Sequence, residues 1–202
     1  MHNDLNQDLD RVLLTADQIA ARVAEMASEV LAGFQDDQGD TPEITPVPIM
    51  TGAFIFAADL IRQLPQKMQI HLMHASSYAG TATTTTAADP SQVKLDATLS
   101  NVPADLTGRH VLVLDDILDS GHTLAAVTAE LKKRNPAGLK TCVLLRKQRD
   151  AALNFPIDHV AFDIPDEFVV GYGLDYDGYY RNLPHIGVLS QAAIDAHLPE
   201  SP

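Results

Sequence analysis

The chain has 202 residues, of which 46 % are hydrophobic, and its formal net charge at pH 7 is −13. This length fits one α/β domain with a buried core. No stretch approaches the roughly 20 apolar residues of a membrane helix, so we expect no membrane partner. The excess of carboxylates argues against a nucleic-acid partner, although it permits a small phosphate ligand held by backbone amides. The single cysteine, Cys142, and the polar residues 1–11 indicate a cytoplasmic protein without disulfides.

The first part of the chain predicts a long helix, a strand and a shorter helix. Residues 15–34 carry apolar side chains at helical spacing and predict the long helix. Residues 35–48 are acidic and contain proline and glycine, so they predict a loop. The short segment 47–50 predicts a strand, and residues 53–64, which end before Pro65, predict the second helix.

A hairpin with a polar tip is predicted next. Residues 68–75 and 93–99 predict its two strands. The tract between them, 76–89, is small and polar and contains four consecutive threonines. Such a tract buries little apolar surface and suits a mobile loop.

The clearest unit of the sequence is a succession of strand, turn, helix and strand. Residues 110–114 form a continuous apolar run, which suits a strand buried on both faces. A turn at 115–122, a helix at 123–134 and a second buried strand at 139–145 predict a right-handed βαβ unit. The remaining elements are a strand at 159–162 and an irregular, aromatic part at 165–189. The chain therefore predicts an α/β fold with a mainly parallel, twisted sheet flanked by helices.

The carboxyl end of the first buried strand combines the features of a sugar-phosphate site. Asp115 and Asp116 leave the strand, and Asp119 stands further along the loop. Residues 120–123, Ser-Gly-His-Thr, then open a helix whose amides and hydroxyls suit a 5-phosphate, while the paired carboxylates suit ribose hydroxyls. Open α/β sheets bind their ligands at this end of the strands. The alternative is that Asp115 and Asp116 merely mark a strand end and that Ser120 caps a helix.

This segment resembles the motif with which type I phosphoribosyltransferases bind phosphoribosyl pyrophosphate (PRPP), and its neighbours resemble the hypoxanthine-guanine branch of that family. The similarity covers roughly residues 47–189. It implies one domain over residues 1–202, with a core at about 45–163, a small purine-recognition hood at about 164–190 and a flexible hairpin lid. It also implies a purine-salvage enzyme that uses Mg²⁺ and transfers the 5-phosphoribosyl group of PRPP to N9 of a 6-oxopurine, hypoxanthine or guanine, to give IMP or GMP and pyrophosphate.

The resemblance also implies a role for each residue around the motif. PRPP is expected to bind Asp115, Asp116, Ser120, Gly121, His122, Thr123, Thr51, Gly52 and Arg181. The purine is expected to bind Lys147, Phe168, Val169 and Asp175, and the lid to contain Ser77 and Tyr78. Asp119 is the implied general base for the purine N7 proton. Asp175 is the implied magnesium residue, with further metal contacts through PRPP hydroxyls near Asp115 and Asp116.

Two positions depart from the family pattern. Thr51 and His122 stand where related proteins often carry lysine, so the backbone amides of these loops are expected to hold the pyrophosphate and the phosphate. Lys147 is implied to donate to the purine 6-oxo group, and it disfavours adenine because a 6-amino group would face a donor with a donor. Phe168 is implied to stack on the base, and Val169 to contact the base edge through its backbone.

Two other functions remain open on the sequence. One is a xanthine-preferring phosphoribosyltransferase. The other is a PRPP-fold regulator that binds nucleotides or RNA, although the charge of −13 and the presence of Asp119, Lys147 and Asp175 count against it. Family members are usually dimers or tetramers, so we expect a homodimer or homotetramer. The apolar face of helix 15–34 is one candidate contact between copies, and core packing explains that face equally well.

Overall fold

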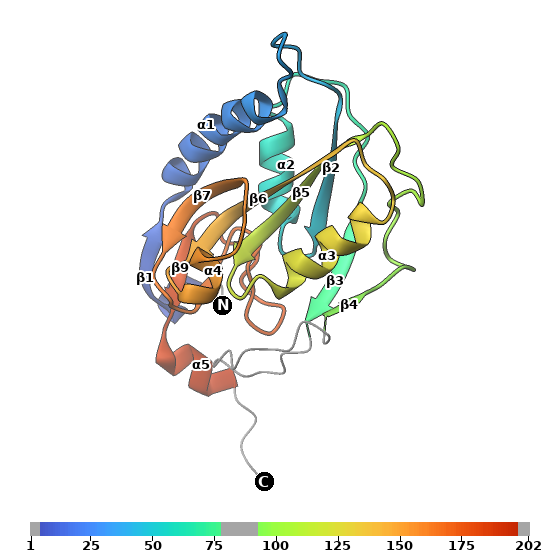
Figure 1. Ribbon diagram of the computed structural model, residues 1–202. Coiled ribbons are helices and arrows are strands. Elements are labelled where there is room, and N and C mark those ends of the chain that lie inside the picture. The colour runs from blue at the N-terminus through green and yellow to red at the C-terminus, as the bar shows by residue number, and fades with distance from the viewer. Residues whose placement is uncertain (1–4, 78–92, 198–202) are drawn as a thin grey trace.

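The structure, a computed structural model, describes residues 5–77 and 93–197 of the chain. Its centre is a six-stranded sheet (Figure 1). From edge to edge the strands are β4 (Val93–Leu95), β3 (Met73–Ser77), β2 (Ile44–Met50), β5 (His110–Leu118), β6 (Gly138–Lys147) and β7 (His159–Ile164). Neighbours from β3 to β7 are parallel, and β4 runs antiparallel to β3. The arrangement confirms the predicted α/β fold with a mainly parallel sheet.

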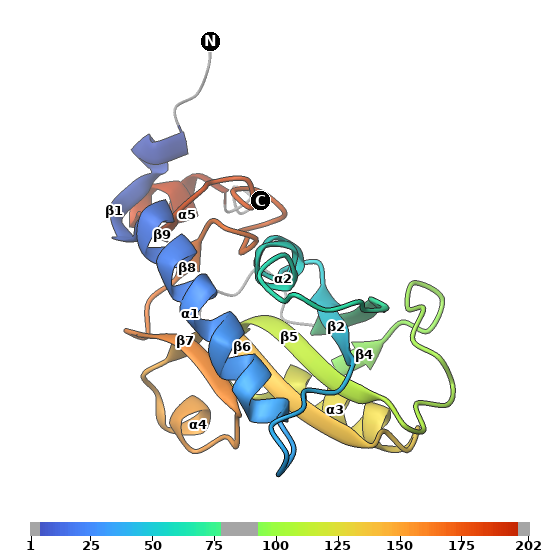
Figure 2. The same ribbon diagram turned by 90° about the horizontal axis from the view of Figure 1, so that it is seen from above.

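Helices cover both faces of this sheet. One face carries α1 (Ala16–Phe34) and α2 (Phe54–Ile61), and the other carries α3 (His122–Lys132) and α4 (Asp150–Leu153) (Figure 2). Successive side chains of β5 point to opposite faces of the sheet. Leu112 and Leu114 therefore join the core under α1 and α2, whereas Val111 and Val113 join the core under α3. Burial on both faces is the reason for the unbroken apolar run of β5.

The long helix α1 begins at a capping box. The Thr15 hydroxyl accepts a hydrogen bond from Gln18 N at 3.3 Å, and the Gln18 side chain accepts one from Thr15 N at 2.8 Å. The apolar residues Ile19, Val23 and Met26 are buried in the core. Core packing therefore explains the apolar face of this helix, and that face is not available for a contact between copies.

Strand β2 begins at Ile44, inside the segment predicted to be a loop, although it contains Pro46 and Pro48. Its ladder with β5 runs from Ile44 to Pro48. Pro46 O accepts a hydrogen bond from His71 N at 3.0 Å, on the side away from β5. Because the N–H and C=O of one residue point the same way, the donors missing from both prolines face the side of β3, whose ladder with β2 begins only at Ile49.

Strand β5 continues to Leu118, so the predicted turn at 115–122 is wrong in its first half. Asp115 pairs with Val143 and Ile117 with Leu145, because β6 runs alongside them. Asp115 and Asp116 therefore lie within the strand and do not leave it. Strand β3 is also shifted, since it begins at Met73 and not at residue 68.

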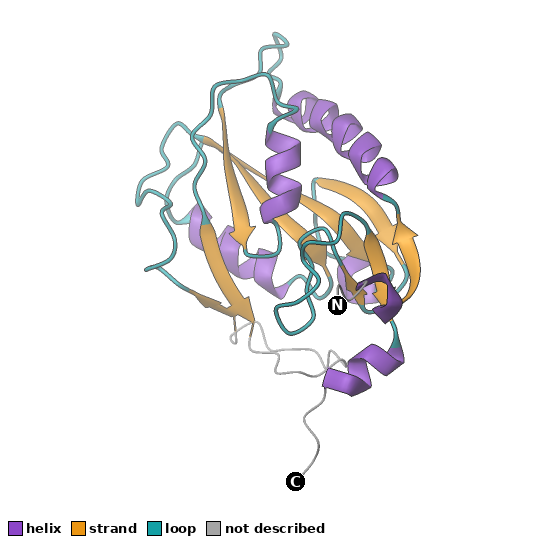
Figure 3. Ribbon diagram, turned by 180° about the vertical axis from the view of Figure 1, so that it is seen from behind, coloured by secondary structure: helices purple, strands orange, loops and turns teal. Residues whose placement is uncertain are grey.

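A second, antiparallel sheet was not predicted from the sequence. Its order is β1 (Leu9–Leu14), β9 (Ile186–Leu189) and β8 (Val169–Val170), with the 3₁₀ turn η1 (Leu5–Asp8) before β1 and helix α5 (Gln191–His197) after β9. The prediction of irregular structure at 165–189 is thus wrong for β8 and β9, and Figure 3 shows mostly loop between them. This sheet buries Val170 and Leu189 together with Tyr176.

The two strands expected to frame a lid are present. Ala75 pairs with Leu95 and Ser77 with Val93, in antiparallel register. Tyr78 and the threonine-rich tract lie outside the described residues, so the lid stays a prediction. Within residues 5–77 and 93–197, no helix has both the length and the apolar character needed to cross a membrane.

Candidate active site

The paired carboxylates lie inside the sheet. Asp115 is 5 % exposed, and Asp116 beside it is half-buried. Asp115 Oδ1 accepts a hydrogen bond from Asp116 N at 3.1 Å. Burial, reinforced by the charge of Asp116, raises the pKa of Asp115 well above its ordinary range, and burial also raises the pKa of Asp116. Ligand hydroxyls that donate to the pair would stabilise its ionised form, as its expected role toward ribose requires.

The expected pyrophosphate loop lies against this pair. A cis peptide bond joins Met50 to Thr51, which is exposed. A Cβ atom on Gly52 would lie 1.9 Å from Asp116 Oδ2, and a Cβ atom on Gly173 would lie 2.2 Å from Gly52 O. Gly52 is therefore enclosed between β5 and the hood segment (residues 164–190), and the close approach of both neighbours requires a residue without a side chain.

Arg181 reaches the same place from the hood segment. Its Nη1 donates to Gly173 O at 2.6 Å, and its Nη2 lies 2.7 Å from Asp175 Oδ1. The second oxygen of Asp175 accepts a hydrogen bond from Gly178 N at 2.8 Å. Burial raises the pKa of Asp116, and the charge of Arg181 partly offsets this rise. The structure thus brings together the residues expected at the pyrophosphate and the metal.

The expected phosphate loop makes a tight bend into α3. Gly121 has φ +81° and is the N-cap residue of the helix, which has no side-chain cap. A Cβ atom there would lie 2.3 Å from the ring of Phe155. Because Gly121 holds the capping position, the alternative in which Ser120 merely caps the helix is wrong. The first-turn amides, starting at His122, carry the partial positive charge that suits an anion.

Four charged side chains alternate in sign at the end of β6. Lys147 Nζ lies 3.3 Å from Asp119 Oδ2 and 3.3 Å from Asp166 Oδ1. Arg149 Nη1 binds Asp119 Oδ1, and Arg149 Nε lies 3.8 Å from Asp166 Oδ2. Lys147 is only 8 % exposed, which is unusual for a lysine at a strand end. The expected general base and the expected donor to the 6-oxo group are therefore in contact.

The hood segment begins beside Lys147. This lysine pairs with Ile164, which is the last residue of β7 and the first residue of the hood segment. Val169 is buried in β8, and the half-buried ring of Phe168 meets Tyr176 edge to face, with centroids 5.4 Å apart. Contacts of Phe168 and Val169 with a purine remain predictions.

Sequence reasoning assigned no role to Arg149, Asp166 or the pair of Tyr172 and Asp59. Tyr172 Oη donates to Asp59 Oδ2 at 2.6 Å and so joins the hood segment to α2. Arg149 and Asp166 lie in stretches that carry the family resemblance, but charged residues at strand ends are usually solvated. Their contacts with Asp119 and Lys147 join segments that are distant in the chain, so no sequence signal could have revealed them.

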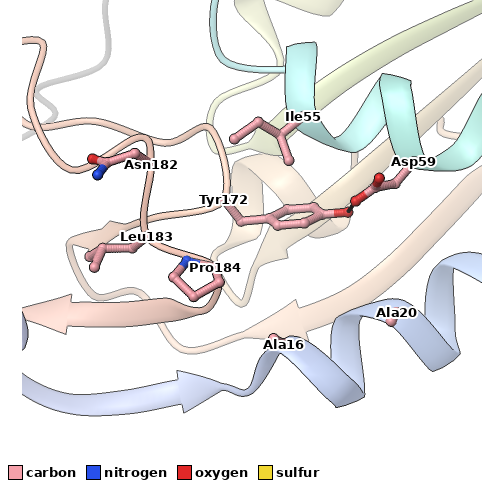
Figure 4. A pocket seen from close by; sticks show the side chains of 8 residues that line it. All are labelled: Ala16, Ala20, Ile55, Asp59, Tyr172, Asn182, Leu183 and Pro184. Atoms are coloured by element: carbon pink, nitrogen blue, oxygen red, sulfur yellow. Dashed lines mark hydrogen bonds between the residues drawn. The ribbon is translucent and has the colours of Figure 1, made fainter.

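A pocket of about 360 Å³ lies beside the Tyr172–Asp59 hydrogen bond (Figure 4). It is formed between α1, α2 and the hood segment, with Ala16, Ile55 and Leu183 in its walls. The residues that line it include none of those expected to bind PRPP or the purine. It is therefore separate from the charged groups around β5 and β6.

Comparisons with known proteins point to one family. A sequence profile described as the phosphoribosyl transferase domain matches residues 13–177. The chain is 40 % identical over 183 residues to the hypoxanthine-guanine phosphoribosyltransferase of Mycobacterium avium, which covers 90 % of this chain and 86 % of that protein. It is 39 % identical over 176 residues to the hypoxanthine phosphoribosyltransferase of Haemophilus influenzae, with 87 % and 93 % covered. A solved structure of a mutant hypoxanthine phosphoribosyltransferase from Trypanosoma cruzi, complexed with the product IMP, matches with a TM-score of 0.82 and 31 % identity, over 96 % of this chain and 97 % of that one.

Proposed function

Because this chain belongs to the phosphoribosyltransferase family, we infer that it is a 6-oxopurine phosphoribosyltransferase of purine salvage. It transfers the 5-phosphoribosyl group of PRPP to N9 of hypoxanthine or guanine and releases pyrophosphate. The observation that supports this base class most directly is the buried Lys147 ammonium, 3.3 Å from Asp119 Oδ2. A buried cation beside a carboxylate can donate to a 6-oxo group, whereas the 6-amino group of adenine would meet it donor to donor.

The sugar end of the site stabilises charge separation. The bond from ribose C1 to the pyrophosphate oxygen breaks, the bond from C1 to N9 forms, and the transition state has oxocarbenium character. Asp115 and Asp116 accept hydrogen bonds from the ribose hydroxyls. The amides of Thr51 and Gly52, together with Arg181, stabilise the negative charge that develops on pyrophosphate.

The base end of the site handles the proton. Asp119 accepts the N7 proton as N9 attacks, so the purine leaves the reaction neutral. Lys147 releases Asp119 Oδ2 and donates to the 6-oxo group, which draws electron density away from the ring. Phe168 stacks on the purine face, and Ser120 and Thr123 hold the 5-phosphate with the first-turn amides of α3.

Magnesium fits the pyrophosphate end. Asp175 offers carboxylate oxygens, which this hard cation prefers, and it lies 2.7 Å from Arg181, the expected partner of pyrophosphate. When bound with PRPP at Asp175, magnesium supplies charge neutralisation for the leaving pyrophosphate.

The direct test is nucleotide formation from PRPP and magnesium with hypoxanthine, guanine, xanthine and adenine in parallel. Product from hypoxanthine or guanine, and none from adenine, is the expected result. Faster turnover of xanthine would favour the alternative of a xanthine-preferring enzyme. PRPP binding without product from any base would favour a nucleotide-binding regulator and overturn the proposal.

A single substitution tests the role of Asp119. Asp119→Asn removes the proton acceptor but keeps the size of the side chain, so kcat is expected to fall by about 10²–10⁴-fold while PRPP still binds. Asp37→Asn, at an exposed loop position, is the matched control. Full turnover by Asp119→Asn would remove Asp119 from this role.

We also propose that the enzyme self-associates as a homodimer or homotetramer. Because the apolar face of α1 is buried in the core, another surface must form the contact. Light scattering at several concentrations tests this proposal against the 21.9 kDa of one chain. A constant mass of one chain would contradict it.

A further inference from the structure

The hydrogen bond between Tyr172 and Asp59 joins two segments that are distant in sequence. Tyr172 Oη donates to Asp59 Oδ2 at 2.6 Å, and Figure 4 shows the ring reaching from the hood segment to α2. Tyr172 is 7 % exposed, and burial, together with this bond, raises the pKa of its phenol. The phenol therefore remains a proton donor throughout the physiological pH range.

On the hood side, Tyr172 adjoins the residues that hold Arg181. Tyr172 N donates to Leu183 O at 2.8 Å, and Gly173 N donates to Arg181 O at 3.0 Å. The Arg181 side chain returns to Gly173 O at 2.6 Å and to Asp175 at 2.7 Å. The position of the Arg181 guanidinium therefore depends on the backbone directly beside Tyr172.

On the other side, Asp59 belongs to the helix that follows the pyrophosphate loop. Helix α2 begins at Phe54, and Phe54 N donates to Thr51 O at 3.2 Å, which links the loop to the first turn. Gly173 meets the loop itself, because a Cβ atom there would lie 2.2 Å from Gly52 O. The hood segment thus contacts the loop at Gly173 and the helix behind it at Asp59, and two separate contacts fix an orientation that one cannot.

We propose that the Tyr172–Asp59 hydrogen bond is a positioning contact for the leaving group. It holds Arg181 opposite the Thr51–Gly52 loop so that both bind pyrophosphate at once. The inference rests on the proposed function, and it adds two residues that touch neither substrate. Because the bond lies at the pyrophosphate end, its loss should weaken PRPP and pyrophosphate and leave the purine unaffected.

Tyr172→Phe tests this inference by removing a single oxygen. A lost hydrogen bond to a charged group predicts a KM for PRPP, and for pyrophosphate in the reverse reaction, that rises by roughly tenfold. The KM for hypoxanthine should stay within about twofold of the wild-type value. Uniform damage to the fold would instead raise the KM for PRPP and the KM for hypoxanthine together. The rise in Tm produced by magnesium pyrophosphate should also shrink, which gives a reading independent of turnover. Tyr179→Phe, in the same segment but 61 % exposed, is the matched control.

Asp59→Ala approaches the same bond from the other side, and it keeps the test informative if one variant folds poorly. Each single variant should raise the KM for PRPP, and the double variant should be no worse than the more affected single one, because both remove the bond between Tyr172 and Asp59. Asp59→Ala also removes the pairing of Asp59 with Arg62, so Arg62→Gln, which removes that pairing alone, is its control. Three results would overturn the inference in an enzyme whose wild type forms nucleotide. The first is an unchanged KM for PRPP in Tyr172→Phe, and the second is an equal rise in the KM for PRPP and for hypoxanthine. The third is an effect of the double variant on the KM for PRPP that equals the combined effects of the two single variants. Failure of the wild type to form any nucleotide would instead overturn the proposed function.

Discussion

Asp119 carries a cation on each of its carboxylate oxygens. Arg149 binds Oδ1, and Lys147 lies 3.3 Å from Oδ2. If Lys147 turns to the purine 6-oxo group, Oδ2 becomes free for the N7 proton, while Arg149 keeps the carboxylate in place. Arg149→Gln is therefore expected to lower kcat by roughly tenfold, since a base that is no longer held spends less time in a reactive geometry.

Arg146→Gln is the control for this prediction, because Arg146 lies near the end of β6, shortly before Arg149, but pairs with Asp163, at 2.6 and 3.0 Å. Steady-state kinetics of both variants with hypoxanthine provide the measurement. An Arg149→Gln enzyme with unchanged kcat would mean that Arg149 serves only the ligand-free state.

The buried carboxylates of β5 should make the ligand-free protein less stable as pH rises. The folded pKa of Asp115 lies above the ordinary value of 3.8, mainly because of burial, so the folded protein keeps a proton that the unfolded chain has lost. The stability that this retained proton gives the folded protein is fully present below pH 3.8, and it is lost as pH rises through the folded pKa of Asp115. Asp115→Asn cannot ionise, so its stability relative to the wild type should be greater at pH 8 than near pH 4.

Thermal unfolding at both pH values tests the prediction, since 1 kcal/mol shifts the Tm of a domain of this size by about 2–4 °C. The variant should also lose PRPP binding. Equal Tm differences at pH 4 and pH 8 would show that the effect of Asp115→Asn does not come from ionisation.

At the scale of elements, the connection from β2 to α2 has no room for a side chain at Gly52. A Cβ atom on Gly52 would lie 1.9 Å from Asp116 Oδ2, and Asp116 Oδ1 is already held by Ile117 N at 2.9 Å. Gly52→Ala must therefore displace the carboxylate or the loop, and a shift of about 1 Å at a reacting centre can cost about 10²-fold in rate. We expect kcat/KM for PRPP to fall by about that factor.

Gly108→Ala is the matched control for Gly52→Ala. Gly108 has φ +78° but has no atom within 4 Å of an added Cβ, so this change introduces backbone strain of about 1–2 kcal/mol without a collision. It should lower Tm and leave kcat/KM for PRPP near the wild-type value. Equal losses of activity in both variants would mean that general destabilisation, and not the collision at Asp116, causes the effect.

The elements that the sequence predicted are those with local signals. The apolar run of β5 and the polar loop before α3 identified the βαβ unit and the expected phosphate site. The end of β5 was misplaced because its last residues, Asp115 to Leu118, are extended by their ladder with β6, which overrides the local preference for a turn. The small sheet was missed because Leu9–Leu14 pairs with Ile186–Leu189, and no local pattern reports a partner that far along the chain.

Residues of the candidate site were predictable for the same reason. Asp115, Asp116 and Asp119 share one short motif. By contrast, the contact of Asp166 with Lys147 exists only because β6 and β7 are in register, with Lys147 beside Ile164. The bond from Tyr172 to Asp59 likewise depends on how the hood segment packs on α2, which composition and spacing do not encode.

At the scale of the whole molecule, PRPP is expected to join β5, the Thr51–Gly52 loop and the hood segment, so its binding should stabilise the entire fold. Magnesium without PRPP should not stabilise the fold. Both oxygens of Asp175 already have partners within the protein, with Arg181 at 2.7 Å from one and Gly178 N at 2.8 Å from the other. A free magnesium ion would have to displace both groups, whereas magnesium that arrives with PRPP brings its own oxygen ligands and gives Arg181 a new partner in pyrophosphate.

Magnesium without PRPP is therefore expected to change Tm by less than about 1 °C. Magnesium with PRPP at a hundred times its Kd should stabilise the protein by about 2.7 kcal/mol, or about 5–10 °C for a domain of this size. EDTA should reverse most of this increase in Tm, because it removes the metal. Asp175→Asn should make the increase smaller, because it weakens the link between the metal and the hood segment. A large rise with magnesium alone would contradict the prediction, since it would require Asp175 to release Arg181 before any PRPP is bound.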